Sequence, residues 1–218
     1  MGLLGSFLGF HLKPRAAAEA EANDVLPSRE RQILDWVDQG MPVPPPHVVK
    51  QAVVLAYAQR CGITTLVETG TYFGAMVEAM HEHFEQIFSI ELSEALFARA
   101  QARFHGMPGI TLLQGDSARE IANVLPQLTA PALFWLDGHW SDGVTARGDT
   151  NTPVREELAA IFAAPDLPHI VLIDDAREFG VDPSYPTIEE LRQLVSAQRP
   201  QWRLSVDADI IRIHPAMI

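Results

Sequence analysis

Short apolar runs alternate with longer amphipathic stretches along most of the chain. Such runs are typical of strands that are buried on both faces of a parallel sheet, whereas helices show apolar residues three and four apart. The apolar runs lie at residues 64–69, 86–92, 110–114, 132–136 and 169–173. Helical spacing follows them over residues 74–84, 93–104, 118–128, 153–163 and 187–198. This alternation predicts an α/β fold.

Further elements flank the alternating part. Residues 28–39 and 47–59 have the apolar spacing of helices, and the proline-rich residues 42–46 between them predict a stiff, extended connector. At the other end, residues 202–206 and 210–213 flank an Asp-Ala-Asp turn and predict an antiparallel hairpin. We therefore divide the chain into an N-terminal segment, residues 1–46, and a main domain, residues 47–218.

The first predicted strand ends in an acid that is followed by a glycine-containing turn. Glu68 closes the strand, and Gly70 and Gly74 follow, with Tyr72 between them. Glycine lets a backbone turn tightly and approach a ligand closely. The spacing differs from the G-x-G-x-x-G of dinucleotide-binding turns, whose ribose-binding acid lies about twenty residues further on. An ordinary strand–helix turn is the alternative interpretation.

The motif Glu68-x-Gly70-x-Tyr72-x-Gly74 resembles the cofactor turn of class I S-adenosylmethionine-dependent methyltransferases. It is most similar to the version in catechol O-methyltransferase and its metal-dependent relatives, where an aromatic residue replaces the middle glycine. The resemblance covers residues 50–218. It implies a Rossmann-like class I methyltransferase fold, with a mostly parallel seven-stranded sheet and a C-terminal antiparallel hairpin, and a catalytic domain that binds S-adenosylmethionine.

Polar residues also follow the second and third predicted strands, where this family has its later cofactor motifs. Glu91 lies 23 residues after Glu68, and the resemblance implies that it accepts hydrogen bonds from the ribose hydroxyls of the cofactor. Asp116 and Ser117 fall where the family contacts the adenine. Either acid could instead cap the helix that follows it, Asp116 especially.

Three carboxylates follow the fourth and fifth predicted strands: Asp137, Asp174 and Asp175. Without a cation they would repel one another, and at least one would have a raised pKa. Mg²⁺ accepts a few carboxylate ligands and leaves positions for substrate oxygens. Catechol and caffeoyl-CoA O-methyltransferases bind metal through an Asp and an Asp-Asn pair at these two places, and macrocin-type enzymes have an Asp-Asp pair at the second. The resemblance therefore implies three metal ligands; the alternative is a metal-free site.

The resemblance also implies a mechanism, in which a metal lowers the pKa of a substrate hydroxyl and a base removes its proton before attack on the sulfonium methyl. Catechol O-methyltransferase uses a lysine just after the strand-four Asp, but the only lysines here are Lys13 and Lys50. His139, two residues after Asp137, is the best substitute as base, or else it orients Asp137. In this family the helix before the first strand often covers the cofactor, so His47 and Lys50 could face the site, but we expect both to lie on a solvated helix face.

Residues 141–150 predict an acceptor-binding loop, because they are polar, rich in glycine and start beside the acids. Arg147 could bind a carboxylate, phosphate or sugar oxygen, and Trp140 could form an apolar wall. Arg177 could share the role of Arg147 or neutralise the acid cluster.

Composition narrows the range of partners. A net charge of −12 over 218 residues argues against nucleic acid as a partner. The single cysteine, Cys61, rules out an internal disulfide and fits a reducing compartment. No apolar run approaches the roughly twenty residues needed to span a membrane. The apolar residues 1–12 could pack on the domain or pair two subunits in a homodimer.

The leading hypothesis is a cytoplasmic, S-adenosylmethionine-dependent O-methyltransferase that uses Mg²⁺ or another divalent cation and acts on a hydroxyl of a small molecule or sugar. One alternative is a metal-free methyltransferase of the same fold with a nitrogen or other acceptor. The other is a non-catalytic cofactor-binding scaffold, although a scaffold has no use for gathered like charges.

Overall fold

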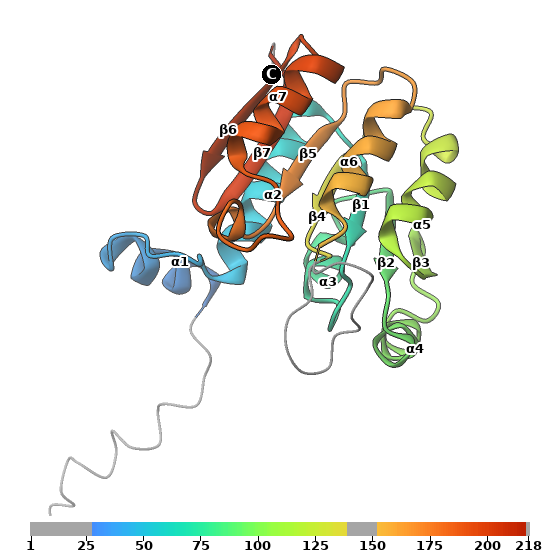
Figure 1. The fold of residues 1–218 in the computed structure, drawn as a ribbon. Coiled ribbons are helices and arrows are strands. Elements are labelled where there is room, and N and C mark those ends of the chain that lie inside the picture. The colour runs from blue at the N-terminus through green and yellow to red at the C-terminus, as the bar shows by residue number, and fades with distance from the viewer. Residues whose placement is uncertain (1–27, 139–151, 217–218) are drawn as a thin grey trace, which may run out of the picture.

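The computed structural model describes residues 28–138 and 152–216, and its centre is a seven-stranded sheet of order β3-β2-β1-β4-β5-β7-β6 (Figure 1). The first five strands pair in parallel, and β7 runs antiparallel to both β5 and β6. The strands are β1 Thr65–Thr69, β2 Gln86–Glu91, β3 Ile110–Gln114, β4 Leu133–Leu136, β5 Ile170–Ile173, β6 Trp202–Asp207 and β7 Ile210–Pro215. The predicted sheet and its C-terminal hairpin are confirmed.

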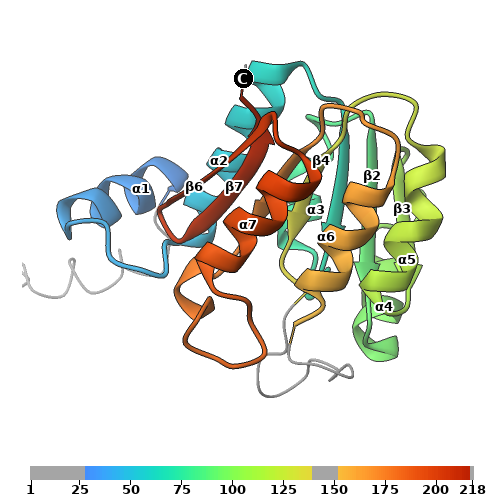
Figure 2. The same ribbon diagram turned by 45° about the horizontal axis from the view of Figure 1, so that its top comes forward.

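Helices cover both faces of this sheet. They are α1 Arg29–Asp38, α2 His47–Cys61, α3 Ala75–Met80, α4 Glu94–Arg103, α5 Ser117–Val124, α6 Val154–Ala163 and α7 Ile188–Gln198, with short 3₁₀ turns η2 Leu125–Gln127 and η3 Ala176–Glu178. Figure 2 shows α5, α6 and α7 in front of the sheet, and α2 and α3 behind it. Successive side chains of a strand point to opposite faces of the sheet, so each face has its own hydrophobic core. In β4, Phe134 packs with the first group of helices and Trp135 with the second.

The helix after the glycine turn is shorter than predicted. It ends at Met80, and the N–H groups of His83 and Phe84 both donate to the Met80 carbonyl, at 2.9 and 3.2 Å. This tightened turn brings Phe84 into the core, where it is buried. Met76, Val77 and Met80 of this helix belong to the core, since each is at most 2% exposed.

Helix α1 lies at the edge of the molecule, away from the sheet (Figure 1). It contacts α2 through Trp36, which packs with Val48 and Val49 and donates from Nε1 to the Pro42 carbonyl at 2.8 Å. Leu34 on α1 is exposed. The division of the chain at residue 46 stays a prediction. None of the helices in the described ranges combines the length and the apolarity that a membrane span requires.

Helix α7 begins with a reciprocal cap that should contribute measurably to stability. The Thr187 hydroxyl accepts from the Glu190 N–H at 3.1 Å, and a Glu190 carboxylate oxygen accepts from the Thr187 N–H at 2.7 Å. We expect Thr187→Ala to lower the free energy of unfolding by about 1 kcal/mol in urea denaturation, because one helix N–H loses its partner. Ser196→Ala, at an exposed position of the same helix, should have no effect or raise stability slightly. Equal stabilities for the two variants would contradict this role of the cap.

Candidate cofactor and metal site

The parallel strands bring the predicted site residues to one edge of the sheet. Ligands of open parallel sheets gather at the carboxyl ends of the strands, and β1, β2, β4 and β5 each have an acid within their last two residues or directly after them. Strands β4 and β5 are adjacent, and their last residues, Leu136 and Ile173, pair with each other. The residues that follow these two strands must therefore lie close together.

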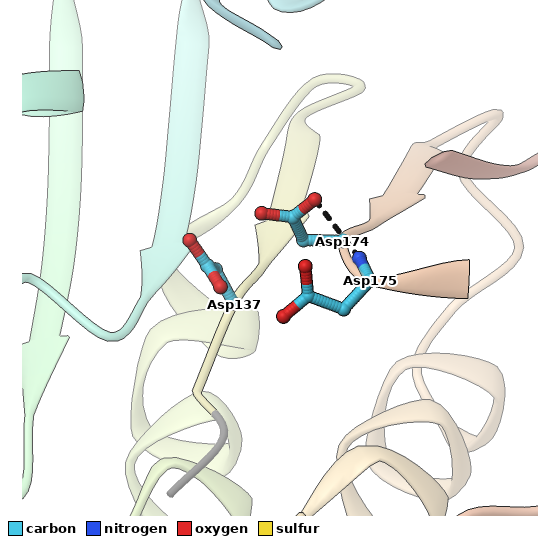
Figure 3. Close-up of side chains that lie close together, drawn as sticks. All are labelled: Asp137, Asp174 and Asp175. Atoms are coloured by element: carbon cyan, nitrogen blue, oxygen red, sulfur yellow. Dashed lines mark hydrogen bonds between the residues drawn. The ribbon is translucent and has the colours of Figure 1, made fainter. Parts of the chain in front are cut away.

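The carboxylates of Asp137, Asp174 and Asp175 meet at this edge, as predicted (Figure 3). One oxygen of each lies within 4.8 Å of the others. Asp174 and Asp175 are buried, and Asp137 is partly buried. An oxygen of Asp174 also accepts a hydrogen bond from the Asp175 N–H at 2.9 Å, which fixes the pair relative to each other. Three inward-facing carboxylates are a donor set for a hard cation.

The backbone at Asp175 is in the left-handed region, with φ +56° and ψ +46°. This region is uncommon for residues other than glycine and is concentrated at functional sites. The turn directs Arg177 back toward Asp175, whose carboxylate accepts from Nη1 at 2.7 Å. The same guanidinium also pairs with the buried carboxylate of Asp209. Arg177 thus neutralises part of the acid cluster, and its role toward an acceptor stays a prediction.

Lys50 lies in the site, and the expectation of a solvated helix face is wrong for this residue. Its ammonium group donates to Asp174 and lies 3.8 Å from an Asp175 oxygen, with 13% of the side chain exposed. His47, one turn earlier on α2, is exposed as expected. The prediction for Lys50 failed because tertiary packing sets the orientation of α2 over the strand ends. The local sequence pattern does not reveal this orientation.

The acid cluster carries more negative charge than Lys50 can balance. Burial raises the pKa of Asp174 to about 7, and the nearby carboxylates of Asp137 and Asp175 add to this rise. Burial also lowers the pKa of Lys50, but the carboxylate of Asp174 outweighs it, so the net pKa is raised. The neighbouring carboxylates thus raise both pKa values, adding to the effect of burial at Asp174 and opposing it at Lys50.

The predicted cofactor turn packs directly against the end of β4. Gly70 has φ +83°, and a Cβ atom there would clash with the carbonyl oxygen of Asp137. Gly74 has φ +77°, and its Cβ would lie 2.6 Å from the ring of Phe104. Both positions therefore need glycine for space as well as for backbone conformation. Tyr72 projects its side chain outward, with 45% of it exposed.

The two predicted cofactor-binding acids, Glu91 and Glu68, have different hydrogen-bond partners. The Glu91 carboxylate accepts from the Tyr72 N–H at 2.8 Å and from the Ser93 N–H at 2.9 Å, which ties the turn to β2. Glu68 is fully enclosed, accepts from the Ser89 hydroxyl, and has a pKa raised to about 8 by burial. The predicted contacts of both acids with the cofactor stay predictions.

The third predicted cofactor motif begins α5. Asp116 caps the helix by accepting from the Ala118 N–H at 2.9 Å, so the capping interpretation is confirmed. Ser117 is buried. Its hydroxyl faces Glu157 of α6, whose pKa is raised to about 7 by burial and lowered only in part by the Ser117 and Thr69 hydroxyls. Any contact of Asp116 and Ser117 with adenine stays a prediction.

Glu157 is a site residue that our sequence analysis missed. Its side chain is 1% exposed, and among the described residues its Oε1 atom has no hydrogen-bond partner. A signal was present, because Glu157 lies three residues after Val154 and four before Ile161, both buried on the same helix face. Three further predictions, on His139, Trp140 and Arg147, fall outside the described residues.

The buried acid Glu68 should make stability depend on pH. Its folded pKa of about 8 lies above its ordinary value near 4.5, so the folded state loses stability as pH rises through this window. We expect the cofactor-free protein to lose on the order of 4 kcal/mol of unfolding free energy between about pH 5 and pH 8, relative to Glu68→Gln, in urea titrations. Glu85→Gln, at an exposed position, should follow the wild type. A parallel loss in Glu68→Gln would assign the effect to other groups.

No model of a protein family matches the chain, and a search of curated proteins also finds no match. Solved structures do match. The O-methyltransferase TomG from Streptomyces achromogenes, in complex with S-adenosylmethionine, has a TM-score of 0.55 and 14% identity over 92% of this chain and 95% of its own. The O-methyltransferase from Bacillus cereus, in complex with S-adenosylhomocysteine, has a TM-score of 0.58 and 13% identity over 91% and 96%.

The S-adenosylhomocysteine-bound methyltransferase PaMTH1 of Podospora anserina has a TM-score of 0.53 and 17% identity over 97% of this chain and 99% of its own. At such identities the likeness concerns the fold. It agrees with the strand order and the antiparallel β7 described above. The chain has the Rossmann-like fold of class I S-adenosylmethionine-dependent methyltransferases.

Proposed function

We propose that the protein is an S-adenosylmethionine-dependent O-methyltransferase that uses Mg²⁺ or another divalent cation and methylates a hydroxyl of a small molecule or sugar. The observation that carries this proposal is the meeting of Asp137, Asp174 and Asp175 beside the glycine turn. Support for the cofactor comes from the fold, since solved structures of the same fold hold S-adenosylmethionine or its product. The acid cluster at the ends of β4 and β5 speaks against a scaffold.

The three aspartates fit a divalent cation. They offer only carboxylate oxygens, which hard cations prefer, and their excess negative charge is evident in the raised pKa of Asp174. A dication would neutralise the repulsion among the three aspartate carboxylates, which the Lys50 ammonium group neutralises only in part. When bound, such a cation supplies Lewis acidity, which lowers the pKa of an acceptor hydroxyl.

The chain's own residues would position the two reactants. Gly70 and Gly74 let the turn pack tightly at the end of β1, where a cofactor would bind, and Glu91 would accept hydrogen bonds from its ribose. Asp137 lies between this turn and the β5 acids, so it would align the acceptor hydroxyl with the cofactor methyl. Alignment of two bound reactants can supply much of the acceleration of such a transfer. We propose His139 as the proton acceptor or as the residue that orients Asp137.

A second candidate function follows from the position of Lys50. Its ammonium group already contacts Asp174, so the protein could work without a metal, as a methyltransferase for a nitrogen or other acceptor. In that case the lysine would be the permanent counter-ion of the cluster. Metal titration separates the two candidates.

We expect chelator-stripped wild-type protein to bind S-adenosylhomocysteine in calorimetry and the complex to bind Mg²⁺. Asp174→Asn should keep cofactor affinity within about threefold but weaken Mg²⁺ at least about 100-fold, because one charged ligand is lost. Asp38→Asn, an exposed acid on α1, is the matched control and should leave both unchanged. Failure of the wild type to bind S-adenosylhomocysteine would overturn the methyltransferase assignment. An unchanged Mg²⁺ response in Asp174→Asn would overturn the metal site.

Lys50→Met tests the metal-free candidate. If a metal binds the three aspartates, removal of the competing ammonium should raise Mg²⁺ affinity on the order of tenfold, as the site becomes more negative. Arg60→Met, at an exposed position of the same helix, should not change Mg²⁺ affinity. Cofactor binding without any Mg²⁺ response in either the wild type or Lys50→Met would favour the metal-free function.

A further inference from the structure

A small polar pocket lies beside the acid cluster, between the ends of β4 and β5 and the first turns of α6. Its volume of about 10 Å³ has room for about one water-sized group. The polar part of its lining consists of Asp137, Gly138, Thr152, Glu157, Asp174 and Tyr185. The pocket thus adjoins two of the proposed metal ligands but extends beyond them to a third element, α6.

Glu157 is the residue of this pocket that most favours the binding of a ligand. The side chain is 1% exposed, and Oε1 has no hydrogen-bond partner among the residues described. Gly138 lies beside this oxygen, since a Cβ atom there would be 3.5 Å from Oε1 and 3.2 Å from the Thr69 hydroxyl, so a side chain at this position would narrow the approach to Oε1. A buried polar atom without a partner destabilises the folded state, and a ligand could recover this energy.

The charges around the pocket select the kind of ligand. The charged residues of its lining, Asp137, Glu157 and Asp174, are all acids. Lys50 pairs with Asp174, and a dication at the aspartates would leave Glu157 as the lining acid without a cation among the described residues. The pocket hydroxyls of Tyr185 and Thr152 interact with each other. An anion would therefore be repelled, and a positively charged donor would be attracted.

We propose, on the basis of the function proposed above, that this pocket receives the primary ammonium group of the methyl acceptor, with Glu157 as its counter-ion. The acceptor hydroxyl would then lie at the neighbouring Asp137 and Asp174. An ammonium group has three donors and no acceptor, and it is about the size of a water molecule, so it matches both the charge and the volume. The acceptor is thus an amino alcohol or amino sugar rather than a phosphorylated or acidic compound.

The test compares two probes that differ at one group: 3-amino-1,2-propanediol and glycerol. Their binding to the full-length protein, with Mg²⁺ and S-adenosylhomocysteine present, is measured by ligand-observed NMR titration. We expect the wild type to prefer the amine at least about tenfold, and Glu157→Gln to lose this preference while it still binds S-adenosylhomocysteine. The control Glu156→Gln removes the same charge from the adjacent, exposed position of α6 and should keep the preference.

Each other outcome overturns the inference. Equal affinity for the two probes, no measurable binding of either, or an unchanged preference in Glu157→Gln would show that the pocket does not recognise an ammonium group of the acceptor. A weaker affinity of Glu157→Gln for S-adenosylhomocysteine, with unchanged affinity for 5′-methylthioadenosine, would assign the pocket to the ammonium group of the cofactor instead. Failure of the proposed function is distinguishable, because the wild type would then bind no S-adenosylhomocysteine or would bind it without any response to Mg²⁺.

Discussion

Repulsion among carboxylates at the ends of β1, β4 and β5 is the constraint around which the site is built. Parallel pairing places the ends of β4 and β5 side by side, so Asp137, Asp174 and Asp175 cannot separate without loss of the sheet. The protein compensates with cations from other elements, Lys50 from α2 and Arg177 from η3. Their charge is insufficient, as the raised pKa of Asp174 indicates. A site that remains short of positive charge after folding is suited to bind a cation or a cationic ligand.

Much of the fold could be predicted from local pattern. The apolar runs marked all five parallel strands because strands buried on both faces carry few polar residues, and the turn residues marked the final hairpin. The three aspartates could be placed together for the same reason, since each follows a recognisable strand directly. The glycine turn was identifiable because Gly70 and Gly74 occupy positions where any side chain would collide with the neighbouring structure.

The remaining parts of the site depend on how helices pack, and local pattern does not encode this. Lys50 belongs to a helix whose polar residues could face solvent or the strand ends, and only the angle of α2 over the sheet decides between them. Glu157 was detectable in principle from its spacing with Val154 and Ile161, but an acid on an apolar helix face is easily taken for an exposed residue at the margin. Asp116 is the opposite case. Its role as a helix cap could be predicted from the local sequence, and the structure has this cap.

The contact between Lys50 and Asp174 joins residues that are 124 positions apart in the chain. During synthesis the lysine would therefore leave the ribosome long before the aspartate, and helix α2 would form without its polar partner. Closure of so long a loop has an entropic cost that later contacts must repay, so we expect the acid cluster to assemble among the last parts of the fold. The charge balance of the site therefore depends on the docking of α2. In a molecule whose α2 helix has not docked, the three carboxylates would lie without the Lys50 ammonium group.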